Sequence, residues 1–176
     1  MILCHPFDCF RWYILHMERL TILEFPDKRL RRVSEAITTF DRGLKRLSDN
    51  MLMTMYEEKG IGLAAPQVHI SKQIIIFRMI EDQEKESNEI KITALINPRI
   101  IKTSEETDDK WEGCLSIPGM LGLVKRYSSI SYEGFDMSGN KIQQKAEGLQ
   151  ARIIQHECDH LNGIVYIHRL VDEKAY

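Results

Sequence analysis

The sequence contains only four cysteines, and they show no paired arrangement. Cys4, Cys9, Cys114 and Cys158 form no Cys-x-x-Cys pair and no dense framework. Small secreted proteins that depend on disulfides carry a much denser set of cysteines. We therefore expect no disulfides and a reducing, cytosolic setting.

Long apolar runs and an excess of basic charge are also missing. No stretch approaches the ~20 apolar residues that a membrane-spanning helix needs. The apolar N-terminus, residues 1–16, is interrupted by Asp8 and Arg11 and does not resemble a signal peptide, because no basic region precedes it. The net charge is -2 and no basic run stands out. We therefore expect neither nucleic acid nor a membrane as a partner.

The apolar content is sufficient for one globular core. The chain has 176 residues, of which 43% are hydrophobic, a size and composition typical of a single domain. We expect this domain to span residues 17–176. Residues 1–16 lack a clean helical or strand period, so we expect an N-terminal extension of uncertain order there.

Hydrophobic periodicity predicts both helices and strands. Leu44, Leu47 and Met51 recur at helical spacing within residues 41–59, where Asp41 can cap the helix. A second helix is expected over residues 146–161. Short apolar or alternating segments predict strands at 20–23, 73–80, 90–101 and within 121–135.

The stretch Gln-His-Glu-Cys-Asp-His at 155–160 predicts a metal-binding helix. His156 and His160 are four residues apart, so a helix places both imidazoles on one face, close enough to hold one metal ion. Glu157 lies about 100° around the helix, beside the metal, where a general base for an activated water belongs. Cys158 lies about 200° around and should point into the protein. Gly163 is expected to end the helix.

Two histidines leave the ligand set incomplete, because a catalytic zinc-type site has three protein ligands and one open position. A metzincin needs a histidine six positions after His160, where Tyr166 stands, and a gluzincin needs a downstream glutamate, for which Glu173 is the sole candidate. Neither pattern fits well. An upstream donor remains, and Cys114 in its glycine-flanked turn is the best of these.

Residues 60–67 form a further stretch of interest, Gly-Ile-Gly-Leu-Ala-Ala-Pro-Gln. It lacks the Gly-Lys-Ser/Thr ending of a phosphate loop. Its glycines suit a close approach of the main chain to a ligand or another strand, and Gln67 offers an amide there. Taken alone, this stretch is more often a structural turn.

Three stretches together resemble the signature motifs of the peptide deformylase family. They are residues 60–67, the Glu-Gly-Cys-Leu-Ser stretch at 112–116, and residues 155–160. They occur in the family's order, and the resemblance extends from about residue 20 to residue 170. It implies a metal-dependent hydrolase that removes the formyl group from the N-terminal formyl-methionine of nascent polypeptides and releases formate. It also implies one divalent metal ion, with Fe(II) as the usual native metal and Zn, Ni or Co as replacements.

The resemblance also implies a role for each matching residue. The implied metal ligands are Cys114, His156 and His160. The implied catalytic groups are Glu157 as general acid and base, with Gln67 and the backbone N–H of Leu115 as oxyanion donors. The implied substrate-binding residues are Gly62 and Gly113, whose backbones border the peptide, and Ile61, Leu149 and Ile153, which line the methionine pocket.

The fold we expect is α+β, with antiparallel and mixed β-sheets packed around the C-terminal metal-binding helix. The resemblance further implies formyl-methionyl nascent peptides as partners, transient ribosome association, and a bacterial cytoplasmic or an organellar location. Many family members carry an arginine seven positions after the cysteine ligand, whereas this chain has Leu121. Two alternative functions stay open: a metalloprotease, and a catalytically weak paralogue that binds N-terminal peptides.

Overall fold

The structure is a computed structural model that describes residues 17–79 and 92–171. The expected N-terminal extension, residues 1–16, lies outside these ranges. The helical elements are η1 (Lys28–Arg31), α2 (Arg42–Glu57), η2 (Ala65–Val68), α3 (Gly148–Leu161) and η3 (Tyr166–Arg169). The strands are β1 (Gly62–Ala64), β2 (Ile74–Arg78), β3 (Ile92–Thr103), β4 (Thr107–Cys114), β5 (Ile117–Tyr127), β6 (Ser129–Phe135) and β7 (Lys141–Glu147).

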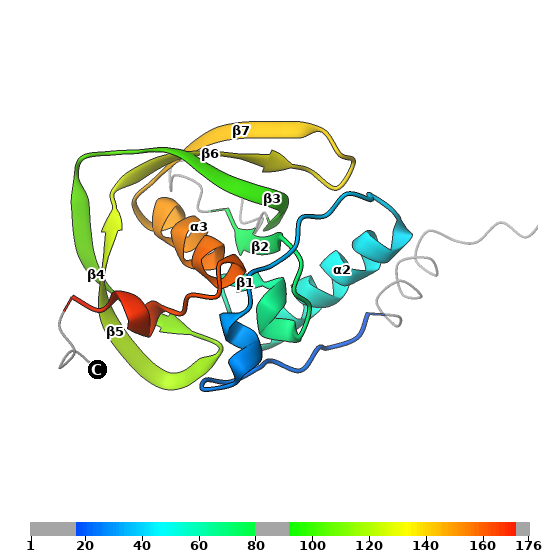
Figure 1. Cartoon of the computed structure of the whole chain (residues 1–176), viewed down its shortest axis with the longest axis horizontal. Coiled ribbons are helices and arrows are strands. Elements are labelled where there is room, and N and C mark those ends of the chain that lie inside the picture. Colours follow the sequence, from blue (N-terminus) through cyan, green and yellow to red (C-terminus); the bar gives the residue numbers. More distant parts are fainter. Residues whose placement is uncertain (1–16, 80–91, 172–176) are drawn as a thin grey trace, which may run out of the picture.

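The strands form two sheets around helix α3. The larger sheet has the order β1-β2-β3-β6-β7, and β4 pairs with β5 in a separate two-stranded sheet. Each strand pair in these sheets is antiparallel. Figure 1 shows α3 crossing the centre of the molecule, with β6 and β7 on one side and β4 and β5 on the other. The predicted α+β architecture around a C-terminal helix is confirmed.

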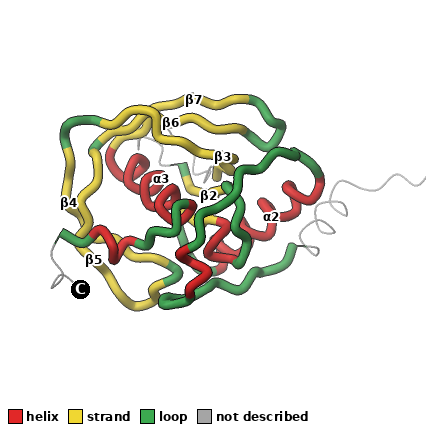
Figure 2. Tube along the Cα trace, viewed as in Figure 1, coloured by secondary structure: helices red, strands yellow, loops and turns green. Residues whose placement is uncertain are grey.

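Strand β2 connects two apolar cores. Its side chains alternate between the two faces of the sheet, as the pleat of a β-strand requires. Ile75 and Phe77 pack in the cluster that contains residues of α3, whereas Ile74 and Ile76 pack in the cluster that contains residues of α2. Figure 2 shows the two helices beside this central part of the sheet. Burial of the strand on both faces therefore fixes α3 relative to the rest of the domain.

Both long helices are confirmed, but the predicted start of the second at residue 146 is wrong, because Ala146 and Glu147 pair with β6 as the end of β7 and α3 begins at Gly148. Asp41 caps α2 by accepting a 2.9 Å hydrogen bond from the backbone N–H of Leu44. Helix α3 ends before Gly163, which has a φ of +72° and so adopts the left-handed conformation that favours glycine. The Cys158 side chain points into the α3 core, as predicted. In the described part of the chain, we find no helix with the length and apolarity needed to cross a membrane.

The strand predicted at residues 20–23 is wrong. This segment has no regular secondary structure. The backbone N–H of Leu20 donates to Thr54 Oγ1 at 2.8 Å, and that of Leu23 donates to the carbonyl of Gln67 at 2.7 Å. These partners are a helix side chain and a 3-10 helix carbonyl, so the segment packs across the surface instead of extending a sheet.

Candidate metal centre

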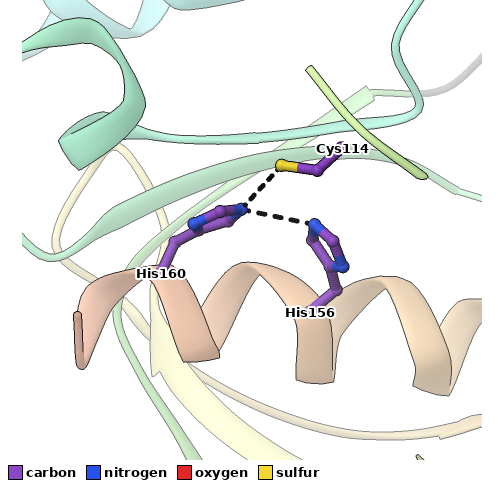
Figure 3. Close-up of side chains that lie close together, drawn as sticks. All are labelled: Cys114, His156 and His160. Carbon is purple, nitrogen blue, oxygen red and sulfur yellow. Dashed lines mark hydrogen bonds between the residues drawn. The ribbon is translucent and has the colours of Figure 1, made fainter. Parts of the chain in front are cut away.

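Cys114, His156 and His160 lie together as a compact group of possible metal ligands. Their donor atoms all lie within 4.8 Å of one another. His160 Nε2 is 3.3 Å from Cys114 Sγ and 3.3 Å from His156 Nε2. Both imidazoles extend from α3 toward the cysteine (Figure 3). One thiol and two imidazoles at this spacing could hold a divalent metal ion.

Two elements of different kinds position these three side chains. The four-residue spacing in α3 stacks the histidines on one face, as the sequence predicts. Cys114 ends β4, and the turn of Leu115 and Ser116 leads into β5. The strand register shifts between Glu112 and Cys114, and the backbone N–H of Ser116 lies 3.4 Å from Cys114 Sγ. This irregular strand end therefore places the sulfur over the histidines.

A buried carboxylate lies behind the first histidine. Glu112 Oε2 is 2.9 Å from His156 Nδ1, the ring nitrogen that does not face His160. Arg126 and Arg152 both donate hydrogen bonds to Glu112. Burial alone would raise the pKa of Glu112, but hydrogen bonds from His156 and Arg126 outweigh it and lower the pKa to about 2. The carboxylate is therefore anionic and fixes the orientation of the His156 ring.

The two histidines differ in their affinity for a proton. Burial lowers the pKa of His156, but its hydrogen bonds to Cys114 and Glu112 outweigh this and raise the pKa to about 10. Burial, together with repulsion from His156, lowers the pKa of His160 well below its usual value. The surroundings of His156 thus favour positive charge, and a metal cation in this group would replace the proton.

Glu157 is buried beside the group and packs against strand β1. A Cβ atom at Gly62 would lie 2.2 Å from Glu157 Oε1, so only glycine leaves room for this carboxylate. Burial raises the pKa of Glu157 to about 7. Its Oε2 atom has no hydrogen-bond partner among the described residues. A carboxyl group with a pKa near neutrality can both accept and donate a proton at physiological pH.

The amide of Gln67 has a fixed orientation next to the cysteine. Its Oε1 accepts a 2.8 Å hydrogen bond from the backbone N–H of Ala64. Its Nε2 consequently faces Ser116 Oγ at 3.1 Å and Cys114 Sγ at 3.4 Å. The side chain is buried in the short helix η2, which follows β1. The structure therefore places an N–H donor beside the possible metal ligands.

A cavity of about 780 Å³ opens onto this group. Gln67, Cys114, Leu115, His156 and Glu157 all line it. The five residues expected to contact a substrate also line it: Ile61, Gly62, Gly113, Leu149 and Ile153. His160 is buried behind the cavity wall. The structure thus brings all the predicted site residues together around one cavity and its wall.

Sequence reasoning missed the side chains that support the site. Arg126 and Arg152 reach Glu112 from different elements, β5 and α3, and such contacts depend on how these elements pack. One signal was present, since Arg152 precedes His156 by four residues on the same helix face. Tyr166 was missed as well, and its ring stacks on that of His156 at a centroid distance of 6.3 Å.

Comparisons with known proteins agree with this geometry. The polypeptide deformylase family matches residues 19–176. Peptide deformylase 1 of Bordetella pertussis is 44% identical over 153 residues, which make up 86% of this chain and 87% of that protein.

Solved structures are similar over most of the chain. Peptide deformylase from Ehrlichia chaffeensis in complex with actinonin has a TM-score of 0.82 and 39% identity, covering 90% of this chain and 92% of that one. The Met-Ala-Ser-bound class I type b peptide deformylase from Acinetobacter baumannii has a TM-score of 0.79 and 33% identity, covering 86% of this chain and 98% of that one. With its three possible metal ligands, buried glutamate and adjoining cavity, the chain belongs to the polypeptide deformylase family.

Proposed function

We propose that this chain is a peptide deformylase that hydrolyses the formyl group from the N-terminal formyl-methionine of nascent polypeptides and releases formate. The observation that carries this proposal is the group of Cys114, His156 and His160 beside a cavity that Gln67 and Glu157 also line. Family membership supports the same activity. We assign the catalytic domain to residues 17–176, with residues 1–16 as an extension.

We assign the metal ligands as Cys114, His156 and His160. The donor set fits a divalent ion, because Glu112 holds one imidazole in place and the anionic surroundings of His156 attract positive charge. A thiolate with two imidazoles suits Fe(II) or Zn, and we propose Fe(II) as the native metal with Zn, Ni or Co as substitutes. When bound, such an ion supplies a nucleophile by lowering the pKa of water toward neutrality.

We assign Glu157 as the general acid and base. Its raised pKa, about 7, allows it to take a proton from the attacking water and then to pass that proton to the leaving amine. Its Oε2 forms no hydrogen bond with the described residues, which leaves this atom available for the transfer. Gly62 supports the role because it leaves space for the carboxylate against β1.

We assign Gln67 and the backbone N–H of Leu115 as oxyanion donors. The amide of Gln67 is oriented by Ala64, and its Nε2 would turn a hydrogen bond from Ser116 Oγ or Cys114 Sγ to the formyl oxygen as negative charge develops there. Loss of one such donor typically raises the barrier by about 3 to 4 kcal/mol. Both donors lie next to Cys114, and so beside the metal group at which the formyl carbon has to be attacked.

We assign the methionine pocket to Ile61, Leu149 and Ile153, with the backbones of Gly62 and Gly113 bordering the peptide. All five line the cavity, and Ile153 is almost completely buried. A relative from Acinetobacter baumannii is solved with bound Met-Ala-Ser, a peptide that begins with methionine. Nascent chains as substrates imply transient ribosome association and a location in the bacterial cytoplasm, or in an organelle with its own translation.

A formate-release assay tests the proposed function. The protein is loaded anaerobically with Fe(II), and separately with Ni or Zn, and is then incubated with formyl-Met-Ala-Ser. We expect formate together with free Met-Ala-Ser. Cleavage of an internal bond in an unformylated peptide would instead indicate a metalloprotease. Peptide binding without turnover, at one bound metal per chain, would indicate a non-catalytic peptide-binding paralogue.

A further inference from the structure

A second groove lies on a different face of helix α3 from the metal group. Its volume is about 880 Å³, and it shares no lining residue with the cavity at the metal group. Helix α3 forms its floor with residues spaced three and four apart, which share one helix face: Gln155, Cys158, Asp159 and Asn162. The walls come from β3 and β5, between which α3 lies in Figure 1, and from η3. We call this site the rear groove, and its ligand is independent of the proposed hydrolysis.

The rear groove carries an excess of positive charge. Four of its described lining residues are cationic, Arg99, Lys125, Arg126 and Arg169, and one is anionic, Asp159. Asp159 accepts hydrogen bonds from both Arg126 and Arg169, so one negative charge faces two positive charges. A concave surface lined by charge of one sign concentrates ligands of the opposite sign. The groove therefore suits an anion.

The carboxylates behind the groove walls do not cancel this charge. Glu112 forms ion pairs with Arg126 and also with Arg152. Glu133 forms an ion pair with Arg99 and also with a lysine of β7. Each carboxylate is thus shared by at least two cations, and the positive excess remains.

Lys125 is the cation most available to a ligand. It is exposed on β5, and among the described residues none forms an ion pair with it. Arg99 is exposed on the β3 wall. His168 Nδ1 accepts a 3.3 Å hydrogen bond from the backbone N–H of Val165, so in the neutral ring Nε2 carries the proton and can donate it to an anion. Tyr127, whose side chain is 44% exposed, adds an aromatic ring to the lining.

We propose that the rear groove binds a diphosphate group, either as inorganic pyrophosphate or within a nucleotide. Arginine and lysine form charge-assisted hydrogen bonds with phosphate oxygens, and here Arg99 and Lys125 supply them from two different walls. Two adjacent phosphates provide the multiple negative charge that these cations require. The ring of Tyr127 offers a stacking surface for a base. The groove volume lies within the usual range of small-molecule sites, about 300 to 1,000 Å³.

Calorimetric titration of the metal-loaded protein with inorganic pyrophosphate and with adenosine diphosphate tests this proposal. We expect saturable binding that weakens as salt concentration rises, because the cations are exposed. Lys125→Glu should weaken binding by about 10-fold or more, which corresponds to the loss of one charged hydrogen bond. Lys125→Gln repeats the test with less disturbance of the fold. Lys145→Glu is the matched control, because Lys145 is also an exposed strand lysine but does not line the groove.

Tyr127→Leu distinguishes the two sources of the diphosphate. For a nucleotide ligand, this variant should bind adenosine diphosphate roughly 5-fold or more weakly and pyrophosphate as before, since it loses one stacking contact. For inorganic pyrophosphate as the ligand, the variant should leave both affinities unchanged. Metal content is measured after each titration, because diphosphates also chelate metal ions.

Four outcomes would overturn the rear-groove site. The first is the absence of saturable binding of either compound. Unchanged binding in both Lys125 variants would place the anion at the metal group instead. Equal losses in Lys125→Glu and Lys145→Glu would indicate general charge attraction. Binding of a single-stranded RNA, with no binding of pyrophosphate or adenosine diphosphate, would make the groove a nucleic-acid surface.

Discussion

Glu112 Oε2 lies 2.9 Å from His156 Nδ1, so a buried carboxylate holds the ring whose other nitrogen faces the metal group. Glu112→Gln keeps the shape of the side chain but removes the charge that Arg126 and Arg152 share. Disturbing such a supporting partner typically costs roughly 10- to 100-fold in metal affinity. Leaving buried arginines poorly compensated should also lower the free energy of unfolding by about 3 kcal/mol.

Metal titration and urea unfolding of the Glu112 variant measure both effects. Glu133→Gln is the control, since Glu133 pairs with Arg99 and Lys141 on the surface, where such pairs contribute about 0 to 1 kcal/mol. Unchanged metal affinity in Glu112→Gln would show that the His156 ring is held by other contacts, with stacking on Tyr166 as the first candidate.

Glu157→Gln separates proton transfer from metal binding. The amide is nearly the same size, but it cannot accept the proton of the attacking water. We expect kcat to fall by about 10²- to 10⁴-fold, the usual contribution of a general base. Metal content per chain, measured by elemental analysis, should stay at the wild-type value because Glu157 lies outside the three-residue ligand group. Loss of metal together with activity would make Glu157 a ligand and contradict the assignment.

Gly62→Ala tests the contact between strand β1 and the catalytic carboxylate. Its new Cβ atom would lie 2.2 Å from Glu157 Oε1, so the carboxylate has to move. Misplacement of a catalytic group by about 1 Å can cost roughly 10²-fold in rate. We therefore expect a large fall in kcat with unchanged metal content.

Gly148→Ala is the control for the Gly62 variant. Gly148 has a φ of +53° and no heavy atom within 4 Å of the added Cβ atom, so its cost is backbone strain of about 1 kcal/mol. This variant should melt at a lower temperature and keep its kcat. If both variants lost the same stability and activity, general destabilisation would account for the effect at Gly62.

The parts of the fold that the sequence predicted are those with a strong local pattern. Helix α2 has an aspartate cap and regular apolar spacing, and α3 combines that spacing with a terminal glycine. Strand β2 is a short run of β-branched and aromatic residues buried on both faces. In each of these elements the local preference and the tertiary packing favour the same structure, so the sequence pattern alone is sufficient to predict the element.

Strand β4 shows where local pattern fails. Half of the residues in its sequence, Thr-Asp-Asp-Lys-Trp-Glu-Gly-Cys, are charged and the strand is largely exposed, so no apolar alternation marks it. Its hydrogen bonds to β5 hold it in place. Sequence motifs were sufficient to predict the three possible metal ligands. The ion pairs of Arg126 with Glu112 and Asp159, however, depend on the packing of β5 against α3. Sequence spacing carries no information on that packing.

Removal of the metal should destabilise the protein, because a ligand that binds only the folded state shifts the unfolding equilibrium. At a free metal concentration of about 100 times Kd, the stabilisation is about 2.7 kcal/mol. For a domain of this length, that corresponds to a fall in Tm of roughly 5 to 10 °C on chelation. Differential scanning calorimetry with and without chelator measures the shift, and reloading with Fe(II) or Ni should restore both Tm and formate release.

His160→Ala should abolish the chelator-dependent shift in Tm. The control is His69→Ala, which should retain the shift because His69 is exposed and lies outside the ligand group. A shift that persists in His160→Ala would mean that the stabilising metal binds elsewhere in the chain.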